Sequence, residues 1–148
     1  MTILHGMRVF ESSAFVALPL AGMQLAQMGA EVIRFDNLGG GLDHLRRPLA
    51  PNGESLFWHG LNKGKKSFAV NLKTEKGREL VTDLITSDGD DAGLFITNLR
   101  VAGWTDYESL KRKRADLIMV TLKGDRHGGP EVDYTVNPSL GIPHITGA

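Results

Sequence analysis

Asp133 is the residue with the clearest potential for chemistry in this sequence. An apolar stretch at 117–122 is typical of a buried strand, and the turn-rich segment after it delivers Asp133 ahead of Gly141. Ligand sites in α/β proteins lie at the carboxyl ends of strands, and a carboxylate that is ionised at neutral pH can act as a nucleophile. The other interpretation is that Asp133 caps a helix beginning near Tyr134.

Lys123 is the cation best placed to meet a phosphate, because it leaves a buried strand and enters a glycine-containing loop. Its other interpretation is an ordinary solvated lysine. Two basic clusters, at 63–66 and 111–114, are predicted to be solvated surfaces, as charge runs usually are. His127 is a candidate general base six residues before Asp133, although its charged, glycine-rich surroundings favour an exposed side chain.

The composition excludes several classes of function. Lys and Arg together number 17, as do Asp and Glu, so no net field attracts nucleic acid or an anionic membrane. There are no cysteines for disulfides or thiolate chemistry, and the five histidines are spaced too widely to predict a metal site. The N-terminal residues lack a signal-peptide pattern, and no segment has the roughly 20 apolar residues of a membrane span. We therefore expect a cytoplasmic protein with no metal, no nucleic acid and no membrane among its partners.

Hydrophobic periodicity predicts strands that alternate with helices. The strands are expected at 7–11, 31–36, 67–72, 93–98 and 117–122. The helices are expected at 18–28, 74–85 and 107–114. This alternation predicts a Rossmann-like, doubly wound, mainly parallel α/β sheet, and 148 residues suffice for one such domain. In the second helix Thr74 is the predicted N-cap, and Leu80, Leu84 and Ile85 are expected to face the sheet.

A dinucleotide-binding domain is one alternative that this alternation raises. Asp36 ends the second predicted strand, where such domains place the acid that binds a ribose. A pyrophosphate-binding turn needs glycines, yet 11–19 reads ESSAFVALP and contains none. The glycine-rich stretch at 37–41 follows a strand without opening a clear helix. A nucleotide-binding oxidoreductase domain is therefore the less favoured alternative.

Five sequence blocks, in this order along the chain, carry a family resemblance. They are SAFVALPLAGMQLAQMGAEVIRFD at 13–36, GGGLDHLRR at 39–47, NKGKKSFAVNLK at 62–73, ITNLR at 96–100, and Asp133 with the closing ITG at 145–147. Together they resemble the class III CoA-transferase family. The resemblance implies the N-terminal part of that family's large α/β domain, and an enzyme that transfers CoA between acyl groups.

The resemblance also implies a site. Asp133 would be the nucleophile that attacks a thioester carbonyl, forming a mixed anhydride while CoA leaves as a thiolate. Coenzyme A or an acyl-CoA would be the substrate, with no tightly bound cofactor. Two members of the family, formyl-CoA transferase and α-methylacyl-CoA racemase, carry an arginine at the position of Asn37, and Arg46 or Arg47 is a candidate replacement for it. The residues implied in CoA binding are Phe15, Val16, Asn37, Val70, Asn98, Leu99 and Lys123.

The wording at 15–36, 61–70 and 132–147 most resembles one branch of the family. That branch implies transfer of CoA between the two carboxyls of mesaconyl (2-methylfumaryl)-CoA. Family members are longer, so 1–148 is expected to be a truncated CoA-binding domain. The family's interlocked dimers imply a homodimer or a complementing fragment here. A non-catalytic CoA-binding or assembly fragment is the other alternative.

Overall fold

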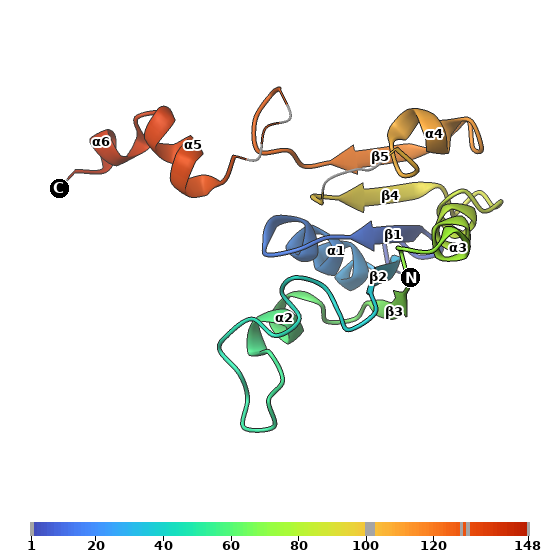
Figure 1. Ribbon diagram of the computed structural model, residues 1–148, viewed down its shortest axis with the longest axis horizontal. Helices are drawn as coiled ribbons and strands as arrows, with labels where there is room; N and C mark the ends of the chain where they lie inside the picture. The colour runs from blue at the N-terminus through green and yellow to red at the C-terminus, as the bar shows by residue number, and fades with distance from the viewer. Residues whose placement is uncertain (1, 100–102, 128, 130, 148) are drawn as a thin grey trace.

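The computed structural model describes residues 2–99, 103–127, 129 and 131–147. Within these ranges the chain forms a five-stranded, all-parallel sheet in the order β3-β2-β1-β4-β5 (Figure 1). The strands are β1 Arg8–Ser12, β2 Glu31–Asn37, β3 Lys66–Val70, β4 Leu94–Thr97 and β5 Ile118–Thr121. The order reverses between β1 and β4, so the carboxyl ends of these two strands form the topological switch point. This topology confirms the predicted doubly wound α/β fold.

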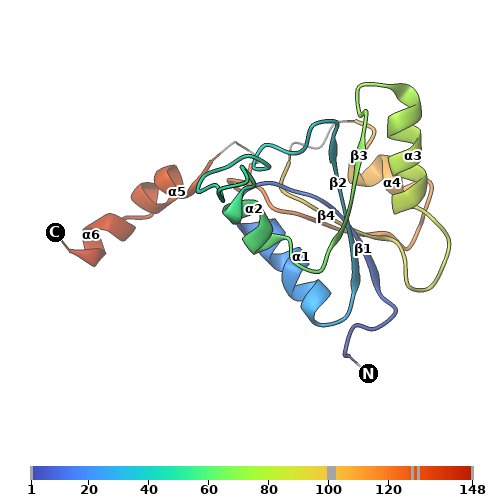
Figure 2. The ribbon, with the colours of Figure 1, turned by 90° about the horizontal axis from the view of Figure 1, so that it is seen from below.

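Helices cover both faces of the sheet. They are α1 Ala17–Gln27, α2 Leu56–Leu61, α3 Glu75–Ile85, α4 Tyr107–Lys111, α5 Asp133–Ser139 and α6 Ile142–Thr146. Figure 2 shows α1 and α2 on one face and α3 and α4 on the other. α5 and α6 pack against each other and extend beyond the sheet, on the side at which the strands end (Figure 1).

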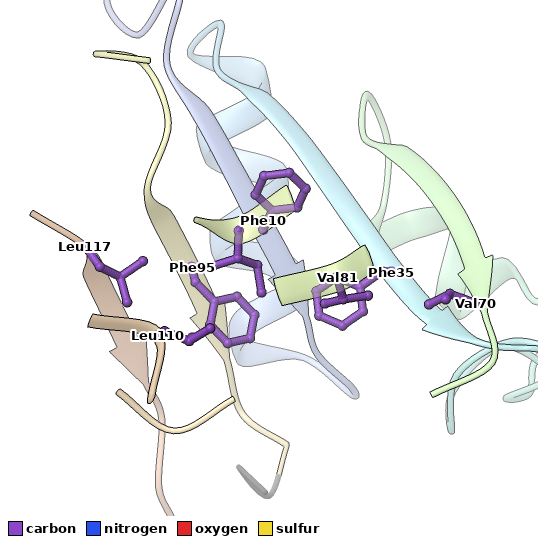
Figure 3. Packing of buried hydrophobic residues seen from close by; sticks show 8 residues of the cluster. Phe10, Phe35, Val70, Val81, Phe95, Leu110 and Leu117 are labelled. Carbon is purple, nitrogen blue, oxygen red and sulfur yellow. The ribbon is translucent and has the colours of Figure 1, made fainter. Parts of the chain in front are cut away.

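Each face has its own hydrophobic core, because successive residues of a strand point to opposite faces. The Phe35 ring on the α3 and α4 face lies 6.0 Å from the Phe68 ring and 6.1 Å from the Phe95 ring, centroid to centroid. The buried cluster on this face is Phe10, Phe35, Val70, Val81, Ile85, Phe95, Leu110 and Leu117 (Figure 3). The cluster on the α1 face is Val9, Leu18, Ala30, Val32 and Ile96.

The predicted strands and helices lie close to their observed positions. Thr74 caps α3 as predicted, because its Oγ1 accepts a hydrogen bond from the Gly77 N–H at 3.2 Å. The predicted inner face of α3 is wrong at Leu80, which is half exposed, whereas Val81 and Ile85 are fully buried. The pattern predicts neither α2 nor α6, since helices of six and five residues make fewer than two turns.

In the part of the chain that the structure describes, no helix combines the length and the apolar character needed to cross a membrane. The same residues contain no cluster of three or more His, Asp or Glu side chains arranged to hold a metal ion.

Candidate functional site

The residues implied in ligand binding lie at one edge of the sheet. The five strands are parallel, so their carboxyl ends meet at this edge (Figure 1). Asn37 and Val70 are the last residues of β2 and β3 and pair with each other in the sheet. The others follow the ends of β1, β4 and β5: Phe15, Val16, Asn98, Leu99 and Lys123. The edge contains the switch point, which is the usual ligand position in open α/β sheets.

Asn98 joins the two strands that flank the switch point. Its Oδ1 accepts a hydrogen bond from the Ala14 N–H at 2.9 Å, and its Nδ2 donates to the Ala14 carbonyl at 2.8 Å. The side-chain amide thus fixes the turn after β1 against the end of β4. It retains a second N–H and a second lone pair for another partner.

Side chains also hold the rest of the turn after β1. Phe15 has a φ of 66°, in the left-handed region that residues with a Cβ seldom adopt. Its N–H donates to Oδ2 of Asp43 at 3.0 Å, and Arg34 Nη2 donates to the Ser13 carbonyl at 2.9 Å. The N–H groups of Ala14 and Phe15 therefore point to protein acceptors, whereas a dinucleotide-binding turn directs such groups at a pyrophosphate. This is a second argument, after the missing glycines, against the oxidoreductase alternative.

The outer side of the turn carries apolar side chains beside a cation. Phe15 and Val16 are 47% and 49% exposed. The Arg46 guanidinium carbon lies 5.3 Å from the centroid of the Phe15 ring and 4.7 Å from that of Phe57. Arg46 makes no ion pair with any acid in the described ranges, so its charge can meet an anionic ligand. α1 begins at Ala17 without a side-chain cap, which leaves its first turn open as well.

A buried network of charges lies behind the turn. Arg34 of β2 donates to both carboxylate oxygens of Asp36, at 2.8 and 3.2 Å, and to Oδ1 of Asp43 at 3.1 Å. Glu11 of β1 accepts a hydrogen bond from Lys65 Nζ at 2.7 Å and lies 3.6 Å from Arg34 Nη1. The prediction of a solvated basic cluster is wrong at Lys65, whose side chain is 1% exposed.

Burial shifts the pKa values of this network. Desolvation raises the pKa of Glu11 although Lys65 opposes the shift, and it lowers the pKa of Lys65 although Glu11 opposes it. Burial also acts against the charge of Arg34, but hydrogen bonds and the charge of Asp36 outweigh it and raise the Arg34 pKa. Oε2 of Glu11 is buried and has no hydrogen-bond partner among the described residues. It packs against Gly22, where an added Cβ would lie 1.7 Å away.

Sequence reasoning does not identify this network as part of the site. Glu11 and Arg34 carry a usable signal, because they are charged residues inside strands expected to be buried on both faces. Asp43 lies in the irregular loop between β2 and α2, where an acidic residue is ordinary. Nothing in the local pattern distinguishes it from a solvated aspartate.

The remaining candidates differ in how much of the side chain a ligand can reach. The Val70 side chain is buried in the core, so it is closed to a ligand. Asn37 and Lys123 are exposed, and Lys123 makes no ion pair with an acid in the described ranges. Leu99 is partly buried. His127, the candidate base, is exposed as expected and accepts a hydrogen bond at Nε2 from Arg126 Nε at 3.0 Å.

Asp133 is the first residue of α5. The N-cap position belongs to Val132, whose N–H donates to Thr135 Oγ1 at 3.0 Å, so the interpretation of Asp133 as a helix cap is wrong. The Asp133 carboxylate is exposed, and no hydrogen bond or ion pair joins it to another described residue. α5 lies on the side of the sheet at which the strands end (Figure 1). Asp133 therefore shares that side with the other candidates without contacting them through a polar interaction.

The fold defines an α/β domain with a Rossmann-like sheet, and exposed apolar side chains lie beside a cation at its switch point. The chain belongs to CoA-transferase family III, because the model of that family matches residues 4–148. This match confirms the family resemblance of the five sequence blocks.

The chain is similar to proteins of known activity and to a solved structure. It is 62% identical over 146 residues to 2-methylfumaryl-CoA isomerase of Chloroflexus aurantiacus, covering 98% of this chain and 36% of that protein. It is 36% identical to succinate–glutarate CoA-transferase of Agrobacterium fabrum, covering 97% and 39%. A CAIB/BAIF family protein from Brucella suis has a TM-score of 0.82 and 31% identity, covering 95% and 40%. The chain thus spans between 36% and 40% of the length of these relatives.

Proposed function

We propose that this chain binds acyl-CoA and takes part in CoA transfer between the two carboxyls of mesaconyl (2-methylfumaryl)-CoA. The observation that carries the proposal is the 62% identity with 2-methylfumaryl-CoA isomerase over 98% of the chain. The arrangement of the candidate residues along one sheet edge supports it, since that edge is where such folds bind ligands.

The proposed CoA site uses the switch point and the cations beside it. Phe15 and Val16 provide apolar surface for the coenzyme, and the uncapped first turn of α1 favours a negative group. Arg46 and Lys123 are cations without an ion-pair partner in the described chain, and both lie at or near this edge. Charge-assisted hydrogen bonds from such groups are suited to the phosphates of CoA. Arg46 is thus the better candidate for the arginine missing at Asn37, because it contacts Phe15.

In the proposed reaction Asp133 is the nucleophile. One carboxylate oxygen attacks the thioester carbonyl, the C–S bond breaks and CoA leaves as a thiolate, so the acyl group is held as a mixed anhydride. The thiolate then attacks the aspartyl carbonyl, which releases the diacid and leaves a CoA thioester on Asp133. The second carboxylate of the diacid attacks this thioester, CoA leaves again as a thiolate, and a second mixed anhydride forms. The thiolate finally attacks the diacid carbonyl of this anhydride, which gives the product thioester. The Asp133 carboxylate is regenerated, and no other reactant is consumed.

This sequence requires that the thiolate and the free diacid stay bound between steps. Interactions with the distant part of CoA provide the binding energy that holds the thiolate near the reacting groups. The switch-point residues are proposed to serve this purpose, while Asp133 performs the covalent step. We further propose a cytoplasmic homodimer or a complementing fragment as the active assembly. The exposed side chains of Ile118, Val120 and Leu122 alternate along and just after β5, so they share one face of the sheet and support a partner on that face.

The test is turnover of the C1 thioester of mesaconate by this chain, with the C4 thioester identified by chromatography. Asp133→Asn should abolish turnover and preserve CoA binding, because the amide keeps the shape but cannot form the anhydride. Glu131→Gln is the matched control, since Glu131 is an exposed acid two residues earlier and should be dispensable. Full activity of Asp133→Asn would refute Asp133 as the nucleophile.

The second candidate function is a CoA-binding or assembly module without turnover. It is favoured by the exposed Asp133 carboxylate, which has no polar contact with the sheet edge in the described chain. A chain that binds CoA by calorimetry yet forms no C4 thioester would support this candidate over the first.

A further inference from the structure

Among the described residues, Phe15 is the single non-glycine residue with a positive φ, and it lies at the switch point. At a φ of 66° the Cβ crowds the following carbonyl oxygen, so phenylalanine keeps this conformation only where its surroundings hold it. The stretch 11–19 has no glycine that would relieve this crowding. The contacts made by Phe15 therefore decide the shape of the turn that faces the ligand.

Asp43 makes one of these contacts from the loop between β2 and α2. It is fully buried, and its Oδ2 accepts the Phe15 N–H at 3.0 Å while its Oδ1 accepts from Arg34 Nη2 at 3.1 Å. Arg34 is itself fixed by Asp36. The Asp43 carboxylate thus has a rigid partner on one side and the backbone of the turn on the other, and a charged acceptor makes the bond to Phe15 strong.

The balance of buried charge sets Asp43 apart from the other acids. Arg34 is paired with Asp36 through both carboxylate oxygens, and Lys65 is paired with Glu11. Asp43 is the third carboxylate of this network and shares Arg34 with Asp36, which already binds the guanidinium through both oxygens. Only Oδ1 of Asp43 pairs with Arg34, whereas its Oδ2 accepts a backbone N–H. Its distinctive contact is the N–H of Phe15.

The same loop also contacts the ring of Phe15. The Arg46 N–H donates to the Asp43 carbonyl at 3.1 Å, and the Arg46 guanidinium carbon lies 5.3 Å from the ring centroid. Two residues of one turn of the loop therefore contact both the backbone and the side chain of Phe15.

We propose that Asp43 is a positioning residue for coenzyme binding. Its carboxylate holds Phe15 in the left-handed conformation, so that the Phe15 side chain and the open first turn of α1 face the ligand before it binds. This inference rests on the proposed function, in which the ligand is CoA. A turn that is already ordered loses less freedom on binding, so Asp43 acts on affinity.

Asp43→Asn tests the proposal on the full chain. Asparagine has the same shape but one acceptor oxygen, so its NH₂ group faces either the Phe15 N–H or Arg34. We expect the dissociation constant for CoA, measured by calorimetry, to rise about tenfold, as loss of one charged hydrogen bond predicts. We also expect the Phe15 amide proton to exchange with D₂O faster relative to the amides of the sheet.

Asp36→Asn is the matched control. It removes the same charge from the same buried arginine but leaves the contact with the Phe15 turn in place. We expect a smaller rise in the CoA dissociation constant than for Asp43→Asn, because the Asp43 carboxylate keeps its bond to the Phe15 N–H. Exchange of the Phe15 amide relative to the amides of the sheet should likewise increase less than in Asp43→Asn.

If Asp43→Asn alone does not fold, a double variant tests whether Asp43 holds Phe15 in the left-handed conformation. Glycine adopts a φ near 66° without crowding, so Phe15→Gly combined with Asp43→Asn should restore folding if Asp43 is there to hold Phe15. A double variant that stays unfolded would overturn the proposal, because the need for Asp43 would then lie elsewhere.

Equal losses of CoA affinity in Asp43→Asn and Asp36→Asn would overturn the proposal, as would unchanged Phe15 exchange in Asp43→Asn. A wild-type chain that binds no CoA would instead refute the proposed function. Exchange of the Phe15 amide would then by itself support or overturn the role of Asp43.

Discussion

Asn98 and Ala14 are joined by two hydrogen bonds, of 2.9 and 2.8 Å, although 84 residues separate them in the sequence. The pair connects the ends of β4 and β1 at the point where the strand order of the sheet reverses. The two strands already share a ladder that ends at Ser12 and Thr97. Asn98 extends this connection past the last strand residues into the turn that carries Phe15.

Removal of this amide should destabilise the protein and weaken the proposed CoA site. Asn98→Ala leaves the partly buried N–H and carbonyl of Ala14 without their partner, which should lower the free energy of unfolding by about 1–3 kcal/mol. Urea unfolding measures this change. Asn52→Ala is the control, because Asn52 is exposed and its side chain bonds to exposed Glu54 alone among the described residues, so its effect should stay within about 0.5 kcal/mol. Equal effects of the two substitutions would contradict the role of Asn98.

The contact between Gly22 and Glu11 predicts that an added methyl group is harmful. Gly22→Ala would place a Cβ 1.7 Å from Oε2 of Glu11, which is buried and cannot move into solvent. We expect a loss of about 1–3 kcal/mol in the free energy of unfolding, although alanine is the better helix former.

Gly60 in α2 provides the control for this substitution. A Cβ at Gly60 meets no atom of the described residues within 4 Å, so Gly60→Ala should be neutral or stabilise by up to about 1 kcal/mol. Thermal unfolding of both variants makes the comparison. A stabilising effect of Gly22→Ala would show that Glu11 is free to move away.

Burial of Glu11 predicts a pH dependence of stability with a definite sign. The Glu11 pKa is raised above its ordinary value of 4.5, chiefly by desolvation. Because the folded glutamate binds its proton more tightly than the unfolded one, its contribution to stability is fully present below pH 4.5 and is lost as pH rises through the raised pKa. Relative to Glu11→Gln, the wild type should therefore lose stability as pH increases above 4.5.

Glu31 supplies the opposite case. Hydrogen bonds from Lys66 and Arg8 lower the pKa of Glu31, so its contribution is present above pH 4.5 and is lost as pH falls through the lowered pKa. Urea unfolding over a series of pH values measures the difference in the free energy of unfolding between the wild type and each variant. We expect this difference to fall with rising pH for Glu11→Gln and to increase with rising pH for Glu31→Gln. Slopes of the same sign would contradict the burial of Glu11.

The exposed Lys123 side chain is expected to contact a phosphate of CoA. Lys123→Ala should weaken CoA binding by about 1.5–3 kcal/mol at low salt, because one charge-assisted hydrogen bond is lost, and should leave thermal stability unchanged. Lys63→Ala is the control, since Lys63 is an exposed lysine in the loop before β3. Calorimetric titration with CoA at low salt measures both variants. An unchanged dissociation constant for Lys123→Ala would identify Lys123 as an ordinary surface lysine.

The sequence by itself determined the alternation of strands and helices, because apolar spacing reports which residues face a core. It also determined the cap of α3 at Thr74, since that hydrogen bond closes within three residues. The family resemblance supplied the candidate residues, and the pattern of strands placed them at one end of the sheet, because parallel strands end together. The sequence also determined the family resemblance, because the five blocks that carry it are read directly from the chain.

Only the tertiary structure decided which charged residues are buried. Lys65 lies in a basic cluster that predicts a solvated surface, but its partner Glu11 is 54 residues away, and the fold brings the two together. The position of Asp43 against Phe15, 28 residues apart, is likewise absent from any local pattern. The free-energy cost of burying a charge depends on donors and counter-charges supplied by distant segments, so local sequence cannot predict which charged residues are buried.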